Sequence, residues 1–165
     1  ARLGIAEENS GKLVTLIRKE AKRIADEQGK DLIIVDGSPG IGCPVIASIT
    51  GADLVLIVTE PTLSGKHDLE RVAELARGFN IPTLVCINKA DINPEVANWM
   101  EADAGKQQIK VAGKISYDSA FTRAQIAQSS VVEYGEGIAC EEVKALWQNV
   151  FCELDEKITI DKDNF

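Results

Sequence analysis

The sequence predicts an α/β fold in which helices flank a mostly parallel β-sheet. Short runs of consecutive apolar residues alternate along the chain with stretches of helical periodicity. Runs that are apolar at every position suit strands covered on both faces, which is the usual arrangement in a parallel sheet. Strands that alternate with helices form βαβ units with right-handed crossovers, so the pattern indicates a layered domain.

Strands are expected where apolar and β-branched residues follow one another. Three runs have this character, at residues 31–36, 53–59 and 82–88. Residues 109–115 form a weaker candidate, and residues 3–6 are a candidate for a short first strand. In an open parallel sheet, ligands bind beyond the carboxyl ends of the strands. The loops after these runs are therefore the place to look for a functional site.

Amphipathic helices are expected between the runs. The first covers residues 13–25, with Ser10 as its N-cap and Gly29 just past its end. A second helix starts near Ser64, and a C-terminal helix covers residues 143–154. Apolar residues spaced three or four apart give each helix one face that can pack on the sheet.

Length and composition indicate one globular domain, expected over residues 1–157 with a C-terminal tail at 158–165. With 18 basic and 26 acidic residues the net charge is −8, which argues against nucleic-acid binding by this chain. No apolar run reaches the roughly 20 residues of a membrane-spanning helix. The four cysteines include no Cys-x-x-Cys pair and are expected to be reduced thiols of a cytoplasmic protein.

The turn after residues 31–36 carries the first candidate site. Asp36 ends an apolar run, where an aspartate can hold Mg²⁺, usually through water. Glycines such as Gly40 let backbone N–H groups approach a γ-phosphate closely, and Pro39 stiffens the turn. The alternative is an ordinary Gly/Pro-rich turn between strand and helix, capped by Asp36.

A second candidate is Asn88-Lys89-Ala90-Asp91, directly after the run at 82–88. In guanine-nucleotide-binding proteins, the asparagine of such a motif bonds the edge of the base. The aspartate accepts hydrogen bonds from the two guanine N–H groups. The alternative is a polar loop in which Asp91 caps the next helix.

A third segment, residues 9–12, superficially resembles the end of a phosphate-binding loop. The full loop has a glycine, four residues, then Gly-Lys-Ser/Thr. Here Ala6 replaces the first glycine and Leu13 replaces the Ser/Thr, so we do not assign that loop. Ser10 and Lys12 nevertheless lie where a helix begins, a position suited to an anion, and are kept as auxiliary nucleotide-facing residues.

Together these segments resemble the later part of a MinD/ParA/Mrp-type P-loop ATPase. The resemblance rests on residues 8–14, 34–45, 58–68 and 87–91, and it extends over about residues 7–133. Within the superfamily it points to the subgroup with an inserted iron–sulfur ferredoxin module, often labelled cobyrinic acid a,c-diamide synthase-like. In that subgroup a Gly-rich loop and the insert come first. Since neither is found here, the resemblance implies the C-terminal part of a longer ATPase.

The resemblance also implies residue roles. Asp36 matches the Walker B or switch II aspartate, which makes it the expected metal ligand, and Gly40 matches the glycine that senses the γ-phosphate. Both are the expected catalytic residues. Asn88 matches an asparagine that contacts adenine, and residues 115–118 resemble the loop that closes over the base. The expected nucleotide-binding residues are Ser10, Lys12, Pro39, Asn88, Lys89, Asp91, Ser116, Tyr117 and Asp118.

The expected function is therefore a nucleotide-dependent switch ATPase that binds ATP and Mg²⁺ at the strand ends. The resemblance implies an intact protein that dimerises across the nucleotide, with an iron–sulfur cluster in its insert. Because the lysine of the phosphate-binding loop is not in the sequence, we expect this chain alone to be inactive.

Two alternatives stay open. Residues 88–91 favour a GTP-binding switch, and a non-catalytic domain that docks onto another subunit is the other alternative. One spacing argues against GTP: GTPases carry a glycine three residues after the switch aspartate, whereas here Pro39 occupies that position and Gly40 follows. This spacing fits the MinD type.

Overall fold

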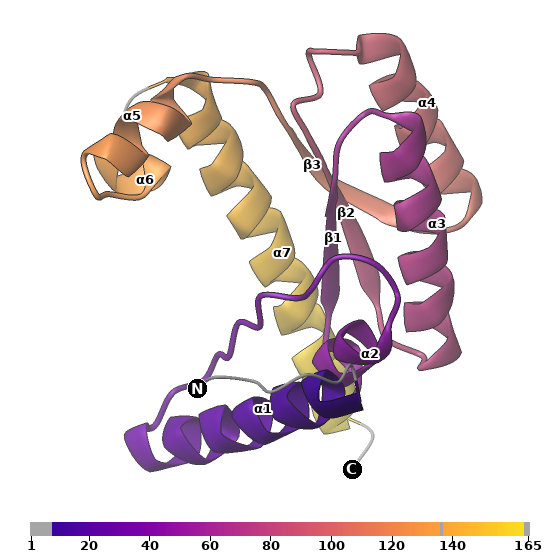
Figure 1. The fold of residues 1–165 in the computed structure, drawn as a ribbon, viewed down its shortest axis with the longest axis vertical. Coiled ribbons are helices and arrows are strands. Elements are labelled where there is room, and N and C mark those ends of the chain that lie inside the picture. Colours follow the sequence, from indigo (N-terminus) through magenta and orange to yellow (C-terminus); the bar gives the residue numbers. More distant parts are fainter. Residues whose placement is uncertain (1–7, 136, 164–165) are drawn as a thin grey trace.

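The computed structural model describes residues 8–135 and 137–163, and it gives side-chain surroundings for residues 10–135 and 137–156. Its described strands form a three-stranded parallel sheet in the order β1-β2-β3, which confirms the predicted α/β fold (Figure 1). The strands are β1 Val55–Thr59, β2 Thr83–Asn88 and β3 Lys110–Ile115. The helices are α1 Glu8–Gln28, α2 Cys43–Ile49, α3 Leu63–Gly78, α4 Pro94–Lys106, α5 Ala120–Ile126, α6 Val131–Tyr134 and α7 Ile138–Asp163.

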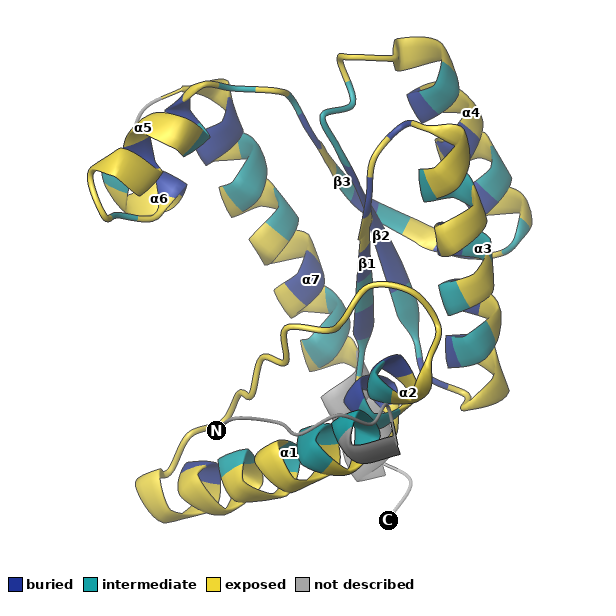
Figure 2. Ribbon diagram, in the orientation of Figure 1, coloured by how far each residue is buried: buried dark blue, intermediate teal, exposed yellow. Residues whose placement is uncertain are grey.

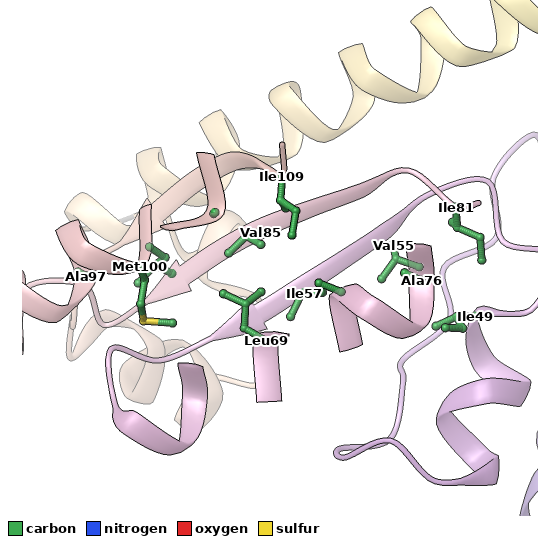
Figure 3. Packing of buried hydrophobic residues seen from close by; sticks show 13 residues of the cluster. Ile49, Val55, Ile57, Leu69, Ala76, Ile81, Val85, Ala97, Met100 and Ile109 are labelled. Atoms are coloured by element: carbon green, nitrogen blue, oxygen red, sulfur yellow. The ribbon is translucent and has the colours of Figure 1, made fainter. Parts of the chain in front are cut away.

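The sheet is covered on both faces, which explains why its strands are apolar at consecutive positions. Alternate residues of a strand point to opposite faces. In β2, Val85 and Ile87 pack with α3 and α4 on one face, in the cluster that Figure 3 shows. Leu84 and Cys86 pack on the other face, which α7 covers. Figure 2 shows the resulting band of buried residues along the strands.

The central strand is fixed by its neighbours on both edges. Val55 of β1 lies opposite Thr83, and the register continues without interruption to Thr59 opposite Ile87. Between β2 and β3 the register shifts at Val85 and Cys86. The four residues Leu84 to Ile87 are all buried, as expected for the middle of a parallel sheet.

The prediction of a strand at residues 31–36 was wrong. The segment between α1 and α2 has neither helix nor strand, and its apolar residues Leu32 to Val35 are 39–73% exposed. A central strand needs partners for its backbone N–H and C=O groups on both sides. Among the described residues the sheet ends at β1, so nothing pairs with this segment. The candidate strand at 3–6 lies outside the described residues.

The helix predictions are confirmed with shifts at their ends. Helix α1 begins at Glu8, so Ser10 lies inside the helix rather than at its N-cap, while Gly29 follows its end with the expected positive φ of 61°. Helix α7 runs from Ile138 to Asp163 and therefore continues across the predicted boundary at 157/158. No described helix is both long and apolar enough to cross a membrane.

Candidate functional site

The loops that follow the three strands share one edge of the sheet because the strands are parallel. They comprise residues 60–62, 89–93 and 116–119. Helices α1 and α2 lie at the opposite edge, where β1 begins (Figure 1). The sequence-predicted site residues are therefore divided between two ends of the molecule.

The tight connection from β1 into α3 requires a glycine at position 65, in the first turn of α3. Thr62 caps α3, its hydroxyl accepting the Gly65 N–H at 2.9 Å, and the Thr59 hydroxyl donates to the Gly65 carbonyl at 2.9 Å. A Cβ atom on Gly65 would lie 2.3 Å from the Glu60 carbonyl oxygen. The turn places the Glu60 side chain beside the next loop.

The loop after β2 begins with Asn88 and Lys89. The Asn88 Oδ1 accepts the N–H of Lys89 at 3.1 Å, and Lys89 has a left-handed backbone with φ 55°, uncommon for a residue with a side chain. The Lys89 ammonium pairs with Glu60 at 2.6 Å. Because both side chains are partly exposed, this pair contributes little to stability, but it joins the ends of β1 and β2.

Asp91 connects the loop after β2 to the loop after β3. Its Oδ1 accepts the N–H of Tyr117 at 2.6 Å, and the Ala90 N–H donates to the Ile115 carbonyl at 3.0 Å. The alternative in which Asp91 caps the next helix was wrong. Asn93 is the N-cap of α4, and its Oδ1 accepts the Val96 N–H at 3.3 Å.

The loop after β3 is held by two more carboxylates. Glu142 of α7 accepts the N–H of Ser116 at 2.7 Å and its hydroxyl at 2.9 Å. Asp118 accepts the Ala120 N–H at 2.8 Å, and this bond is the main reason that the pKa of Asp118 is lowered, with burial opposing it. The Ala139 N–H, at 3.5 Å, adds to the lowering of that pKa.

The remaining predicted residues are not brought to this edge. Ser10 and Lys12 lie on α1, whose Gly11 packs against Cys43 of α2. Asp36, Pro39 and Gly40 are exposed in the segment between the two helices. The structure therefore brings together Asn88, Lys89, Asp91, Ser116, Tyr117 and Asp118, and it does not bring Ser10, Lys12, Asp36, Pro39 or Gly40 to them.

At the opposite end of the molecule, a groove lined by basic side chains lies between α1 and α2. Lys12, Lys19 and Lys22 line it together with Arg18. The Arg18 guanidinium donates to the carbonyls of Ala47 and Thr50 at 2.9 and 2.5 Å, which satisfies the C-terminal end of α2.

Metal-binding and thiol groups are sparse in the part of the chain that the structure describes. No cluster of three His, Cys, Asp or Glu side chains there could hold a metal ion. Asp36 alone does not make a complete Mg²⁺ site. All four cysteines are free: Cys86 and Cys140 are buried, and Cys43 and Cys152 are exposed. Burial, and secondarily the charge of Glu142, raises the pKa of Cys86 to about 11, so this thiol is inert at neutral pH.

Comparison with protein-family models found no match. Two proteins of Methanocaldococcus jannaschii are similar in sequence. Uncharacterized protein MJ0578 is 38% identical over 91 residues, which cover 55% of this chain and 32% of the relative. Uncharacterized protein MJ0579 is 34% identical over 89 residues, which cover 54% of this chain and 32% of the relative. The similarity therefore spans about a third of each relative's length.

Solved structures of MinD proteins share the fold. The septum site-determining protein MinD of Pyrococcus horikoshii, complexed with Mg-ADP, superposes with a TM-score of 0.67 at 18% identity, covering 85% of this chain and 56% of that one. The MinD cell division protein of Aquifex aeolicus gives 0.67 at 20% identity, covering 81% and 58%. The cell division ATPase MinD of Pyrococcus furiosus gives 0.62 at 18%, covering 73% and 51%. The fold is part of the MinD fold.

Sequence reasoning missed Glu142, which contacts the loop after β3. Glu142 lies 26 residues after Ser116 and in another element, yet it makes two hydrogen bonds to that residue. In the sequence it looks like any other charged residue of a helix, and no local motif indicates that it contacts a loop. Only the packing of α7 against β3 brings it to the loop.

Proposed function

We propose that this chain is the base-binding part of a MinD-like, nucleotide-dependent switch ATPase. One observation supports the proposal most strongly. The residues of the Asn-Lys-x-Asp motif and of the turn at 116–118 lie together beyond the carboxyl ends of adjacent parallel strands. That edge is where open α/β sheets bind ligands. A structure with the same fold, the Pyrococcus horikoshii MinD, is complexed with Mg-ADP.

Asn88 has the chemistry to recognise adenine. Its Oδ1 is engaged by the Lys89 N–H, which leaves the amide nitrogen as a donor toward an acceptor nitrogen of the base. The loop at 116–119, held by Glu142 of α7 and by Asp91 of the neighbouring loop, supplies a wall beside it. A pre-ordered wall lowers the entropy lost when a ligand binds.

We propose that phosphate and Mg²⁺ chemistry belongs to a longer protein. This chain spans little more than half the length of the MinD chains it matches. In that longer protein Asp36 would hold Mg²⁺, Gly40 would sense the γ-phosphate, and Ser10, Lys12 and Pro39 would face the nucleotide. Dimerisation, a cytoplasmic location and an iron–sulfur cluster in a ferredoxin insert are parts of the same proposal, supported by the sequence resemblance alone.

The experiment is a titration of the purified chain with fluorescent ATP and GTP analogues in the presence of Mg²⁺. We expect binding that favours the ATP analogue. Asn88→Ala should weaken it about tenfold, the loss of roughly one hydrogen bond. Asn98→Ala, the same change at an exposed position of α4, is the matched control and should bind like the wild type. Equal affinity in the two variants, or no binding to either analogue, would contradict the proposal.

A docking domain is a second candidate, favoured by a different observation. The apolar residues 32–35 are exposed, and one edge of β1 has no partner strand among the described residues. Such surfaces pair with other polypeptides. Size-exclusion chromatography tests this candidate: an oligomer is expected, and a stable monomer would count against it.

A further inference from the structure

We infer that Asp91 is a positioning residue that holds the loop at 116–119, rather than a carboxylate that reads guanine. The inference rests on the proposed function, since it concerns the base side of the same site. It gives the Asn-Lys-Ala-Asp run of this chain a different role from the one that its pattern first suggests.

The Asp91 carboxylate already has a partner inside the protein. Its Oδ1 lies 2.6 Å from the backbone nitrogen of Tyr117, slightly closer than is usual for a charge-assisted N–H···O hydrogen bond. Reading guanine requires both carboxylate oxygens to face the two N–H groups of the base. A guanine N–H that took Oδ1 as its acceptor would compete with the Tyr117 N–H for that oxygen.

The same loop is fixed from its other side. Glu142 of α7 accepts two hydrogen bonds from Ser116, and Asp118 accepts the Ala120 N–H. Gly137 makes room for Asp118, because a Cβ atom there would lie 2.2 Å from Asp118 Oδ2. Asp91 and Glu142 thus hold the neighbouring loop residues Tyr117 and Ser116 from outside the loop, while the loop's own Asp118 ties it to the first residue of α5, Ala120.

This arrangement favours adenine. A site discriminates strongly between bases only where a polar group is available to pair with the group that distinguishes them. With Asp91 Oδ1 engaged by the Tyr117 N–H, the two N–H groups of guanine would have to compete with this bond for the carboxylate of the motif. Asn88 keeps a free amide nitrogen beside the same loop. In this arrangement Asp91 contributes to an adenine site by holding the loop at 116–119, which forms one wall of the site.

Two variants of Asp91 separate the roles. Asp91→Asn keeps an oxygen that can accept the Tyr117 N–H but removes the charge that guanine needs. Asp91→Ala removes both. For a positioning residue, Asp91→Asn should bind the fluorescent ATP analogue within about twofold of wild type, and Asp91→Ala about tenfold more weakly. Neither should change the ratio of ATP to GTP affinity. A selective loss of GTP-analogue binding in both variants would overturn the inference.

A readout without nucleotide makes the test independent of the proposed function. Amide hydrogen exchange of Tyr117, followed by NMR on the full 165-residue chain, should be about tenfold faster in Asp91→Ala and unchanged in Asp91→Asn. Asp68→Ala, at an exposed position of α3, is the control and should leave it unchanged. Failure to bind nucleotide with the exchange pattern intact would refute the proposed function alone. Unchanged exchange in Asp91→Ala would refute the inference.

Discussion

Similar apolar segments are exposed in one region of the molecule and buried in another. The first is the amino-terminal region, residues 8–42, and the second is the sheet region, residues 55–156. In the sheet region, Val85 and Ile87 have 0% exposure. In the amino-terminal region, Ile17 is 57% exposed and Ile34 is 73% exposed. The apolar runs at 31–36 and 83–88 are alike in composition, each with four apolar residues of six. What separates them is that strands and helices on both sides cover β2, whereas residues 31–36 have no such neighbours in the described structure.

The difference teaches that an apolar run becomes a strand only where its backbone and both its faces are covered. Full burial of an aliphatic side chain is worth about 1.5–3 kcal/mol, and an exposed one forgoes most of this. Helix α1 follows the same rule. Its backbone satisfies itself through helical hydrogen bonds, so it forms even though Leu16 and Ile17 stay exposed. A strand has no such internal partner.

The largest expected effect comes from truncating one isoleucine in each region. Ile87→Ala removes a fully buried side chain and should lower the free energy of unfolding by about 2–5 kcal/mol. Ile34→Ala, the same change at an exposed position, should stay within about 0.5 kcal/mol of wild type. Urea denaturation followed by circular dichroism measures both. A loss at Ile34 as large as at Ile87 would mean that residues 31–36 are buried in solution, and the contrast would fail.

Substituting one glycine in each region tests the same comparison at the backbone. Gly65→Ala should lower the free energy of unfolding by about 1–3 kcal/mol, because its Cβ would meet the Glu60 carbonyl at 2.3 Å. Gly37→Ala meets nothing within 4 Å and should be neutral or stabilising by up to about 1 kcal/mol, because it reduces the freedom of the unfolded chain. The melting temperature should therefore fall in Gly65→Ala and should stay the same or rise in Gly37→Ala. A similar drop in both would contradict the prediction.

The smallest expected effect is a dependence on pH. Hydrogen bonds from backbone N–H groups hold the pKa of Asp118 below its ordinary value of 3.8. A lowered pKa in the folded state means that the ionised carboxylate stabilises the fold above about pH 4, and that this contribution is lost as the pH falls further. Asp118→Asn should therefore be less stable than wild type at pH 7, with the gap closing toward pH 3.

Asp36→Asn is the matched change in the amino-terminal region. Asp36 is exposed in the segment between α1 and α2. Its substitution, at an exposed position, should give the same urea midpoint as wild type at pH 7. Parallel curves for Asp118→Asn and wild type from pH 3 to pH 7 would show that the Asp118 carboxylate contributes nothing to the fold.

The apolar pattern of the sequence was enough to predict the three strands that helices cover in the folded chain. The runs at 53–59, 82–88 and 109–115 became β1, β2 and β3 with ends displaced by two residues or fewer. Helix α3 starts at Leu63 with Thr62 as its cap, close to the predicted start. Apolar periodicity predicts these elements because each buries its apolar residues against the rest of the fold.

The short helices α5 and α6 went unpredicted, although Ser130 and Glu133 form a capping box that a sequence can signal. The two helices are 7 and 4 residues long, too short for a periodic pattern to stand out. The run at 31–36 failed for the opposite reason. Its pattern was clear, but the neighbours that a central strand requires are not part of the described sheet.

By itself the sequence determined the α/β class, the three observed strands and the motif residues from Asn88 to Asp91. Only the tertiary structure decided which groups those motif residues contact. Asp91 and Tyr117 are 26 residues apart and meet because parallel strands bring their following loops to one edge of the sheet. Ser116 and Glu142 are also 26 residues apart, and they meet because α7 packs against β3. Hydrogen bonds of this kind depend on distances across the fold, and a pattern along the chain does not contain them.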